Sequence, residues 1–339
     1  MEENHVEILF ENLDKATIMV QEHLDDPYLD SLTLTMDTLF QGTTKEDLDD
    51  ILSRKLITAI KSIDLDDYSP QDLRKTIQLL ILKGMQKSTQ AQHYLTPETV
   101  SLLMGYLTQK LTEKDEHLRI FDPACGTANL LTGVVGQLHQ TKDIYASEID
   151  PTLVQLAVTN ANLQKMNIDF FHQDSLRPFL LDPVDLVISD LPVGYYPDDD
   201  WSQNFELAAD EGHSYAHHLF IEQSLTYLKP GGYALFLIPE FLFDSDQSDK
   251  LHTFLQKNAY IIGVLRLPES AFASKKNIKS ILILQKQTTH MPAPQQPLLV
   301  DLPSLKNTAA MEDILGKINE WFAAYQTNMN TQKGEEGNE

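Results

Sequence analysis

The chain has 339 residues, of which 42% are hydrophobic, and its 26 Lys and Arg face 50 Asp and Glu, giving a formal net charge of -24. This composition excludes a disordered chain, and the length predicts about two domains. A single cysteine excludes an internal disulfide and a multi-thiolate zinc site, so we expect a protein of the reducing cytoplasm.

Residues 1–85 are expected to form a helical N-terminal domain. The first residues lack the basic and apolar regions of a signal peptide. Apolar residues then recur at helical spacing, as at Ile51, Leu52 and Leu56. We interpret the many acidic residues between them as solvated surface. No apolar stretch of the sequence approaches the roughly 20 residues that a bilayer span requires, so we expect no membrane segment.

Strands and helices alternate over residues 86–290. After a helix that opens near Pro97, short apolar and β-branched runs predict strands at 118–121, 143–146, 169–171, 185–189, 233–238, 261–265 and 280–284. This alternation predicts an α/β fold with a doubly wound, mostly parallel sheet covered by helices on both faces. Residues 230–232 predict a turn before a buried strand. Residues 291–339 are expected to form a linker or edge segment, a helix near 311–325 and a frayed tail.

A loop of small residues follows the first predicted strand. Residues 122–126 read Asp-Pro-Ala-Cys-Gly and open the next helix, and a small-residue loop at this point lets the backbone approach a ligand closely. Glu148 ends the second strand, where it could accept hydrogen bonds from both ribose hydroxyls. Asp174 ends the third strand, where it could accept one from an adenine amine. These three strand ends together predict a nucleoside-binding site.

These motifs resemble those of class I S-adenosylmethionine (SAM) methyltransferases, and more narrowly the amino-group DNA methylases of the adenine-N6 type. The chain is also similar to the modification subunits of type I restriction systems, which share a helical N-terminal domain and a Leu-Pro-x-x-x-Phe segment, here residues 267–272. It resembles the stand-alone bacterial proteins of the YtxK type even more closely. The resemblance covers residues 84–287 and implies a Rossmann-like fold with SAM as the cofactor.

The resemblance also implies the cofactor-binding residues. A Thr-Pro segment that helps to hold the cofactor in the family is matched at Thr96, and the ribose-binding acid is matched by Glu148. The expected set is Tyr94, Thr96, Asp122, Ala124, Gly126, Asn129, Glu148, Ile149, Asp174 and Ser175. The alternative cofactor, NAD, is disfavoured because a dinucleotide needs a Gly-x-Gly-x-x-Gly loop. The family often has a second glycine where Ala128 stands, and this change could reduce cofactor affinity.

The resemblance places the reaction at the end of the fourth strand. Related methylases carry Asp, Asn or Ser followed by Pro-Pro-aromatic, and the matching catalytic residues here are Asp190, Leu191 and Pro192. Asp190 would accept one hydrogen bond from the target amine and the carbonyl group of Leu191 another, which orients the nitrogen for direct in-line methyl transfer. Val193 replaces the aromatic residue on which an extruded base would stack.

Further residues are expected to contact the substrate beside Val193. Tyr195 or Tyr196 could replace the missing aromatic ring, or both could pack as ordinary turn residues. Lys275 and Lys276 could contact phosphates, or could protect an edge strand from aggregation. The stretch after Pro192 supplies six carboxylates, from Asp198, Asp199, Asp200, Glu206, Asp210 and Glu211, and residues 191–228 contain no Lys or Arg. DNA is therefore possible as a partner but disfavoured by charge unless a basic partner assists.

Two other chemistries are disfavoured. His213, His217 and His218 have helical spacing, but the glutamate of a zinc protease motif is absent, so we expect no metal site. Cys125 lies in the cofactor loop and is not expected to be a nucleophile. The sequence therefore predicts a SAM-dependent N-methyltransferase that acts on an exocyclic amine, as adenine-specific DNA methylases do. Two alternatives stay open: a methyltransferase acting on a protein amide or an RNA base, and a catalytically degenerate SAM-binding interaction protein.

Overall fold

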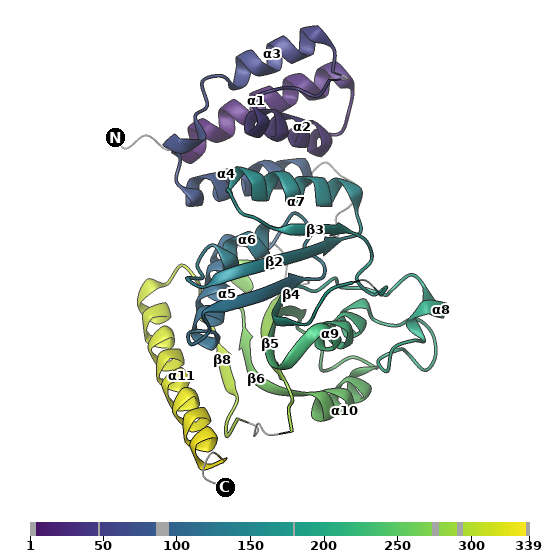
Figure 1. Ribbon diagram of the computed structural model, residues 1–339, viewed down its shortest axis with the longest axis vertical. Coiled ribbons are helices and arrows are strands. Elements are labelled where there is room, and N and C mark those ends of the chain that lie inside the picture. The colour runs from purple at the N-terminus through teal and green to yellow at the C-terminus, as the bar shows by residue number, and fades with distance from the viewer. Residues whose placement is uncertain are drawn as a thin grey trace. The chain divides into compact units, whose positions relative to one another are not determined.

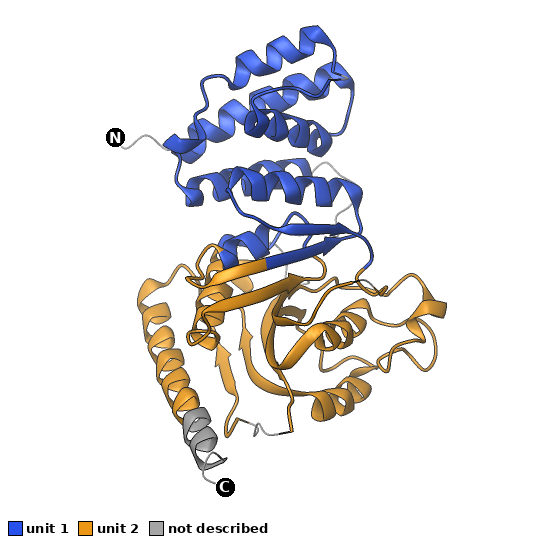
Figure 2. Ribbon diagram, viewed as in Figure 1, with its two compact units in different colours: residues 1–98, 125–135, 144–174 blue, residues 99–124, 136–143, 175–339 orange. Residues whose placement is uncertain are grey.

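The computed structural model describes residues 5–46, 48–85, 95–178, 180–272, 278–289 and 294–336. The chain divides into two compact units (Figure 2). Unit 1 comprises residues 1–98, 125–135 and 144–174, and unit 2 comprises residues 99–124, 136–143 and 175–339.

Helices dominate the first part of the chain, and strands and helices alternate afterwards (Figure 1). The α-helices are α1 (His5–Leu24), α2 (Tyr28–Gln41), α3 (Asp50–Ile60), α4 (Pro70–Met85), α5 (Glu98–Leu111), α6 (Asn129–Val135), α7 (Pro151–Leu163), α8 (Asp199–Ser202), α9 (Ala216–Tyr227), α10 (Ser248–Asn258) and α11 (Thr308–Glu336). The strands are β1 (His117–Asp122), β2 (Thr141–Glu148), β3 (Asp169–His172), β4 (Val184–Asp190), β5 (Leu228–Pro239), β6 (Ala259–Arg266), β7 (Lys279–Lys286) and β8 (Leu298–Asp301). Two short 3-10 helices are η1 (Leu65–Asp67) and η2 (Glu269–Ala271).

The strands form an eight-stranded sheet in the order β3-β2-β1-β4-β5-β7-β6-β8. Strands β1, β4 and β5 pair in parallel, as do β2 with β3 and β6 with β8. Strand β7 runs antiparallel to both β5 and β6. The strand order reverses between β1 and β4, and doubly wound sheets bind ligands at the carboxyl ends of such strands. The expected doubly wound, mostly parallel fold is therefore confirmed.

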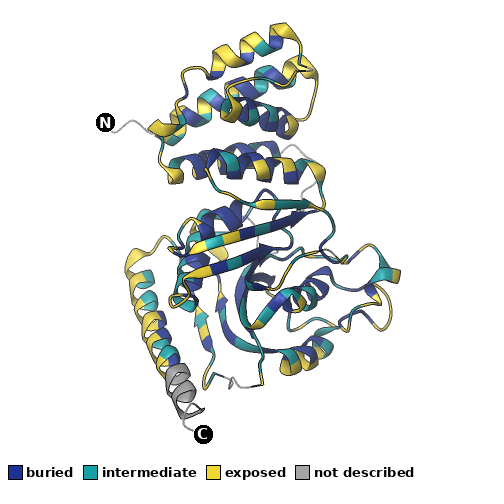
Figure 3. Cartoon of the chain, viewed as in Figure 1, coloured by how far each residue is buried: buried dark blue, intermediate teal, exposed yellow. Residues whose placement is uncertain are grey.

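The central strands form because their sequences are continuous apolar runs. Strand β7 buries six consecutive residues, and strand β5 buries its last six (Figure 3). A strand that is covered on both faces needs apolar side chains on both, which explains why these runs do not alternate with polar residues. The seven expected strands are all present at the expected positions.

Two elements differ from the sequence-based expectations, and a third agrees with one of two alternatives. Residues 298–301, expected to be a linker or edge segment, form strand β8, which pairs with β6 at the edge of the sheet. Helix α11 extends from Thr308 to Glu336 rather than over 311–325. Its polar end contains no proline, and each added residue gains one backbone hydrogen bond. Residues 230–232 form a bulge inside β5 instead of a turn, with Gly231 at φ 80° and a shift in the β4–β5 register.

In unit 1, the N-terminal helices share their core with helix α7. Leucines of α1 to α4 and Leu153, Leu156 and Leu163 of α7 belong to one buried cluster. The hydroxyl of Thr159 donates to Asp37 at 2.7 Å. Helix α7 thus packs in the core of the N-terminal helices and also connects β2 to β3.

In unit 2, helix α11 packs through polar contacts with the sheet and with α5. The Tyr325 hydroxyl donates to Gln285 Oε1 of β7 at 3.1 Å, and the Tyr106 hydroxyl of α5 donates to Asn319 Oδ1 at 2.8 Å. Across the residues that the structure describes, no helix combines the length and the apolar character needed to cross a membrane.

Candidate active site

The carboxyl ends of β1 and β4 are joined by a buried hydrogen bond. The Ser189 hydroxyl donates to Asp122 Oδ1 at 2.9 Å, and the backbone N–H of Ala124 donates to the same oxygen at 3.1 Å. Asp122 is only 1% exposed. The carboxylate of Asp122 therefore fixes the loop after β1 against the end of β4, and Ala124 contributes through its backbone.

Ser175 secures the same loop from another direction. Its hydroxyl donates to the carbonyl oxygen of Pro123 at 2.6 Å, and its own carbonyl accepts a hydrogen bond from Gln223 of α9 at 2.9 Å. Ser175 is buried. The hydroxyl groups of both serines, 175 and 189, are thus engaged in shaping the loop.

Glu148, at the end of β2, is held rigidly by backbone groups. Its Oε1 accepts hydrogen bonds from the N–H groups of Ile149 at 2.8 Å and Asp150 at 2.9 Å, and its Oε2 accepts one from Gly126 at 2.8 Å. A carboxylate offers about four lone-pair positions, so about one remains for a ligand among the described contacts. We expected Glu148 to accept from both ribose hydroxyls, and this arrangement accommodates one such bond without rearrangement.

Asp190, at the end of β4, forms an ion pair with Lys279, the first residue of β7. The side chains of Asp190 and Lys279 are 18% and 16% exposed, respectively. Lys279 lies three residues after Lys276, in the same lysine-rich stretch that could contact phosphates. The sequence does not indicate that Lys279 pairs with Asp190, because the pairing depends on the sheet register.

Leu191 and Pro192 continue from the end of β4. Leu191 is buried, and its N–H donates to the carbonyl of Leu237 in β5 at 3.1 Å. This bond needs a backbone N–H, which the proline found here in related methylases would lack. Leu191 therefore ties the segment that follows β4 to the sheet in a way that the family pattern does not predict.

Comparison with known proteins decides the family. The sequence profile of the family described as N-6 DNA Methylase matches residues 78–332. The chain belongs to the N-6 DNA methylase family. Residues 7–85 match the YtxK N-terminal helical domain, which agrees with the expected resemblance.

Two relatives match nearly the whole chain. The uncharacterized protein YtxK of Bacillus subtilis (strain 168) is 43% identical over 325 residues, covering 95% of this chain and 99% of YtxK. A crystal structure from Listeria monocytogenes, assigned to the class I SAM-dependent methyltransferases, is 41% identical with a TM-score of 0.88, covering 94% of this chain and 99% of that protein. The eight-stranded sheet is thus that of a SAM methyltransferase fold.

More distant relatives come from restriction systems. The type I restriction enzyme EcoEI methylase subunit of Escherichia coli is 25% identical over 253 residues, which are 68% of this chain but 50% of that subunit. A type I modification subunit from Vibrio vulnificus has a TM-score of 0.64 at 17% identity, covering 84% of this chain and 65% of the subunit. The likeness to the Vibrio subunit shows a shared fold.

The N-6 DNA methylase fold of this chain presents residues that fit the nucleoside part of SAM. Gly126 has φ +54°, and no heavy atom lies within 4 Å of the position that a Cβ would take. Ile149, next to Glu148, exposes 64% of its surface, so its apolar side chain is accessible to a ligand. An open backbone, an apolar side chain and a fixed carboxylate suit an adenosine, whose ring is apolar and whose ribose donates hydrogen bonds.

Ala128, which stands where the family often has a glycine, adopts a left-handed backbone conformation. Its φ is 58°, and its side chain is fully buried. This conformation costs an alanine roughly 1–2 kcal/mol. A glycine would adopt it without that cost.

Other expected cofactor residues occupy distinct positions. The Thr96 carbonyl accepts hydrogen bonds from the side chains of Asn129 at 3.1 Å and Gln78 at 2.9 Å, which links the Thr-Pro segment to the start of α6. Asn129 Oδ1 is buried without a hydrogen-bond partner in the described part of the chain, so a donor on a bound molecule would satisfy it. Asp174 is half-buried just beyond β3. Tyr94 lies outside the described residues.

The segment after Pro192 separates the two tyrosines. Tyr196 is 7% exposed, and its N–H donates to the Ser214 carbonyl. Tyr195 is 56% exposed and stacks on Tyr215, with ring centroids 4.9 Å apart and an interplanar angle of 19°. Val193 is 46% exposed. Tyr195 therefore exposes its ring beside the segment that follows β4, whereas Tyr196 is buried. Lys275 and Lys276 lie outside the described residues.

The histidines of α9 form part of an aromatic cluster. His217 and His218 are fully buried, and His217 packs edge-on against Phe241 at 5.9 Å. Burial lowers the pKa of His217 to about 3, with His218 adding to the effect and the Pro192 backbone opposing it. Burial also lowers the pKa of His218 to about 4. No group of three or more potential metal ligands occurs in the part of the chain that the structure covers.

Tertiary contacts neutralise much of the acidic stretch after Pro192. Asp198 pairs with Arg177, which also lies 4.3 Å above the Trp201 ring. Asp210 pairs with Lys250 and Glu206 with Lys257. Asp199 contacts His213, which neutralises it only when the histidine is protonated. The basic partners of Asp198, Asp210 and Glu206 lie outside residues 191–228. The local repulsion of phosphates is therefore weaker than the sequence suggests.

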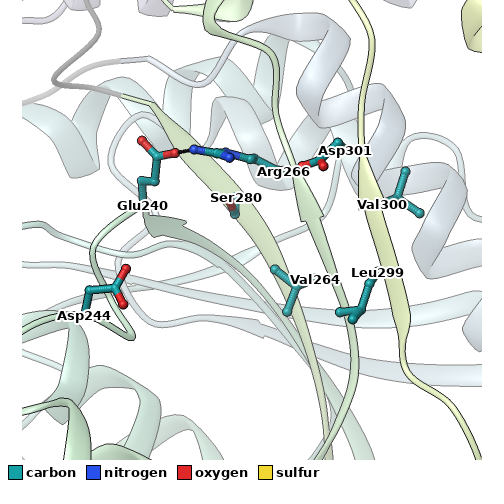
Figure 4. Close-up of a pocket in the computed structure, with 8 residues that line it drawn as sticks. All are labelled: Glu240, Asp244, Val264, Arg266, Ser280, Leu299, Val300 and Asp301. Carbon is teal, nitrogen blue, oxygen red and sulfur yellow. Dashed lines mark ion pairs between the residues drawn. The ribbon is translucent and has the colours of Figure 1, made fainter.

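A pocket of about 520 Å³ lies elsewhere in unit 2 (Figure 4). It is lined by Glu240, Asp244, Val264, Arg266, Ser280, Leu299, Val300 and Asp301, and Glu240 pairs with Arg266 across it. Ser280 of β7 lines this pocket, and its neighbour Lys279 pairs with Asp190.

Proposed function

We propose that this chain is a SAM-dependent N-methyltransferase that transfers a methyl group to a neutral exocyclic amine, in the manner of adenine-N6 methylases. The observation that carries the proposal is the bond between Ser189 and Asp122, which fixes the catalytic segment that starts at Asp190 against the cofactor loop. The assignment of the Listeria relative to the SAM-dependent methyltransferases supports it.

Rigidly held groups of the protein would bind the cofactor. Bound SAM supplies an electrophilic methyl carbon on a sulfonium. Glu148 would hold the ribose, Ile149 would cover the adenine ring, and Asp174 would accept from its amine. Since three backbone N–H groups already hold the Glu148 carboxylate, binding requires little reorganisation there.

The acceptor side would rest on the segment after β4. The Asp190 carboxylate would accept one hydrogen bond from the target amine, and the Leu191 carbonyl would accept the second. Both would orient the nitrogen lone pair and stabilise the positive charge that develops on the nitrogen. No covalent nucleophile is needed, and Cys125 is buried.

Tyr195 would provide the surface that Val193 lacks. Its exposed ring is already stacked on Tyr215, so it is held in place before a base arrives. Stacking on an aromatic side chain contributes roughly 1–3 kcal/mol per base in single-strand binders. This position supports an aromatic heterocycle as the acceptor in preference to a protein amide.

Replacement of Asp190 tests the proposal. In Asp190→Ala, methyl transfer should fall by about 10²-fold or more, because the acceptor loses its main hydrogen bond. Affinity for SAM, measured by calorimetry with SAM and its demethylated product, should stay unchanged. Asp200→Ala changes an exposed acid in the acidic stretch after Pro192. It is the control and should keep full activity. Unchanged turnover of Asp190→Ala would reject the assignment.

The acceptor class is decided by the labelled product. Radiolabelled methyl groups should appear in DNA offered to the wild-type protein, with N6-methyladenine identified by mass spectrometry. Label in RNA or in a protein amide would replace adenine-N6 DNA methylation with one of the alternatives. Tight SAM binding without transfer to any acceptor would indicate a degenerate, cofactor-binding interaction protein.

A further inference from the structure

The Asp190–Lys279 ion pair is built by the sheet register. Asp190 lies beside Leu237 in the β4–β5 pairing, and Lys279 lies beside Pro239 in the β5–β7 pairing. The lysine side chain therefore reaches across β5 to Asp190 Oδ1. Both side chains are more than four-fifths buried, so water screens their interaction weakly.

The pair matters because Asp190 is the residue proposed to accept the target amine. A buried carboxylate without a counter-charge attracts any cation that can reach it. Protonated alkyl amines, such as lysine side chains and free N-termini, are such cations. They carry no lone pair on nitrogen, so they would occupy the acceptor position without reacting.

We propose that Lys279 is a specificity-determining residue whose positive charge excludes protonated amines from Asp190 and selects neutral acceptor nitrogens. The inference rests on the proposed role of Asp190. A carboxylate has about four lone-pair positions, so a lysine at one oxygen does not exhaust its capacity to accept hydrogen bonds. The Asp190–Lys279 pair carries no net charge, so it does not repel the neutral amine of a base or an amide. An ammonium group at Asp190 is repelled by the nearby ammonium of Lys279.

Calorimetry with two small probes tests the inference on the full chain. n-Butylammonium represents protonated amines, and 9-ethyladenine represents neutral exocyclic amines. Lys279→Met should bind n-butylammonium at least about tenfold more tightly than the wild type, because it removes the ammonium group that pairs with Asp190. Its affinity for 9-ethyladenine should change much less. Lys279→Arg keeps the charge and should behave as the wild type.

Two further variants locate the effect. Asp190→Asn combined with Lys279→Met removes both charges and should abolish the gain in n-butylammonium binding. Lys286→Met removes a lysine from the other end of β7, where its ammonium donates to the Leu228 carbonyl at 2.7 Å, and should leave cation binding unchanged. Lys279→Gln keeps a hydrogen-bond donor for Asp190, so it carries the same expectation if Lys279→Met does not fold.

The outcomes separate this inference from the proposed function. If Lys279→Met and Lys279→Gln bind n-butylammonium no more tightly than Lys286→Met, the specificity role is rejected. A gain that persists in the double variant also rejects it, because the cation then binds elsewhere. The measurement needs no methyl transfer, so a failed methylation assay would remove the proposed reaction without altering the charge selection measured here.

Discussion

At the scale of single residues, burial strongly lowers the pKa values of the two adjacent histidines of α9. Their pKa values, lowered to about 3 for His217 and about 4 for His218, keep both rings neutral at physiological pH. A neutral ring can pack against Phe241 and Tyr215 without the cost of burying a charge. These histidines therefore act as aromatic core residues, and acid should loosen the cluster that supports Tyr195.

Stability should consequently fall as pH falls below about 6.5, the ordinary pKa of histidine. Between pH 6.5 and 4 the unfolded chain binds protons at both positions that the folded chain excludes, so lower pH favours unfolding. Each buried histidine should remove about 2 kcal/mol at pH 5 relative to pH 7, since one pKa unit is about 1.4 kcal/mol.

Denaturant unfolding at pH 7 and pH 5 measures this effect. The double replacement of His217 and His218 by Phe should lose less stability between the two pH values than the wild type. His139→Gln changes an exposed histidine and should keep the wild-type dependence. An equal loss of stability in all three proteins would contradict the prediction.

The same scale shows what a motif can and cannot predict. The catalytic segment itself predicts a role for Asp190, but Lys279 lies 89 residues away, and only the strand register brings them together. Tyr195 and Tyr196 are chemically equivalent in the sequence, and the bridge between Tyr195 and Tyr215 decides which ring faces solvent. Ala128 adopts a positive φ, which an alanine in the sequence does not predict.

At the scale of elements, helix α7 serves two structures in unit 1. One side contributes Leu153, Leu156 and Leu163 to the core of the N-terminal helices, and the helix connects β2 to β3. Asp150 caps its start by accepting from Thr152 and Leu153. The N-terminal helices and the strand end that carries Glu148 therefore depend on one helix.

Leu156→Ala should destabilise unit 1 by about 2–5 kcal/mol, because it opens a cavity at a fully buried position in the shared core. Val158→Ala, at a 37% exposed position of the same helix, should cost less than about 1 kcal/mol. Denaturant unfolding followed by circular dichroism compares the two. A smaller effect at Leu156 than at Val158 would show that α7 is not part of the core.

Long apolar runs in the sequence predict the central strands correctly. Strands β4, β5 and β7 were predicted because buried strands need uninterrupted apolar residues. Strand β8 was not predicted as a strand in its own right, because its four residues follow a proline-rich stretch that is typical of a linker. Its pairing with β6 is a tertiary contact, and no local pattern encodes it.

At the scale of the whole molecule, the net charge of -24 opposes polyanions even though ion pairs neutralise part of the rim after Pro192. Pairing within the protein redistributes charge locally but leaves the total unchanged. Phosphate binding releases counterions only where basic residues contact the backbone. We therefore expect that the purified chain needs a basic partner to hold duplex DNA.

Binding of a short duplex should be weak at physiological salt and should strengthen only modestly at low salt. Fluorescence anisotropy with a labelled duplex at both salt concentrations measures this. Addition of a basic partner should increase the affinity and steepen its salt dependence. Tight, strongly salt-sensitive binding by the chain alone would contradict the expectation.

The long interval between Asp190 and Lys279 also affects how the protein is made. At about 5–20 residues per second, a ribosome needs about 4–18 seconds to add the 89 residues that separate them. Throughout this interval the nascent chain carries the carboxylate without its ammonium counterpart. Strand β5 can pair with β4 early, but the carboxylate of Asp190 gains its partner Lys279 only when β7 emerges. The proposed acceptor site is thus completed only after β7 has been translated.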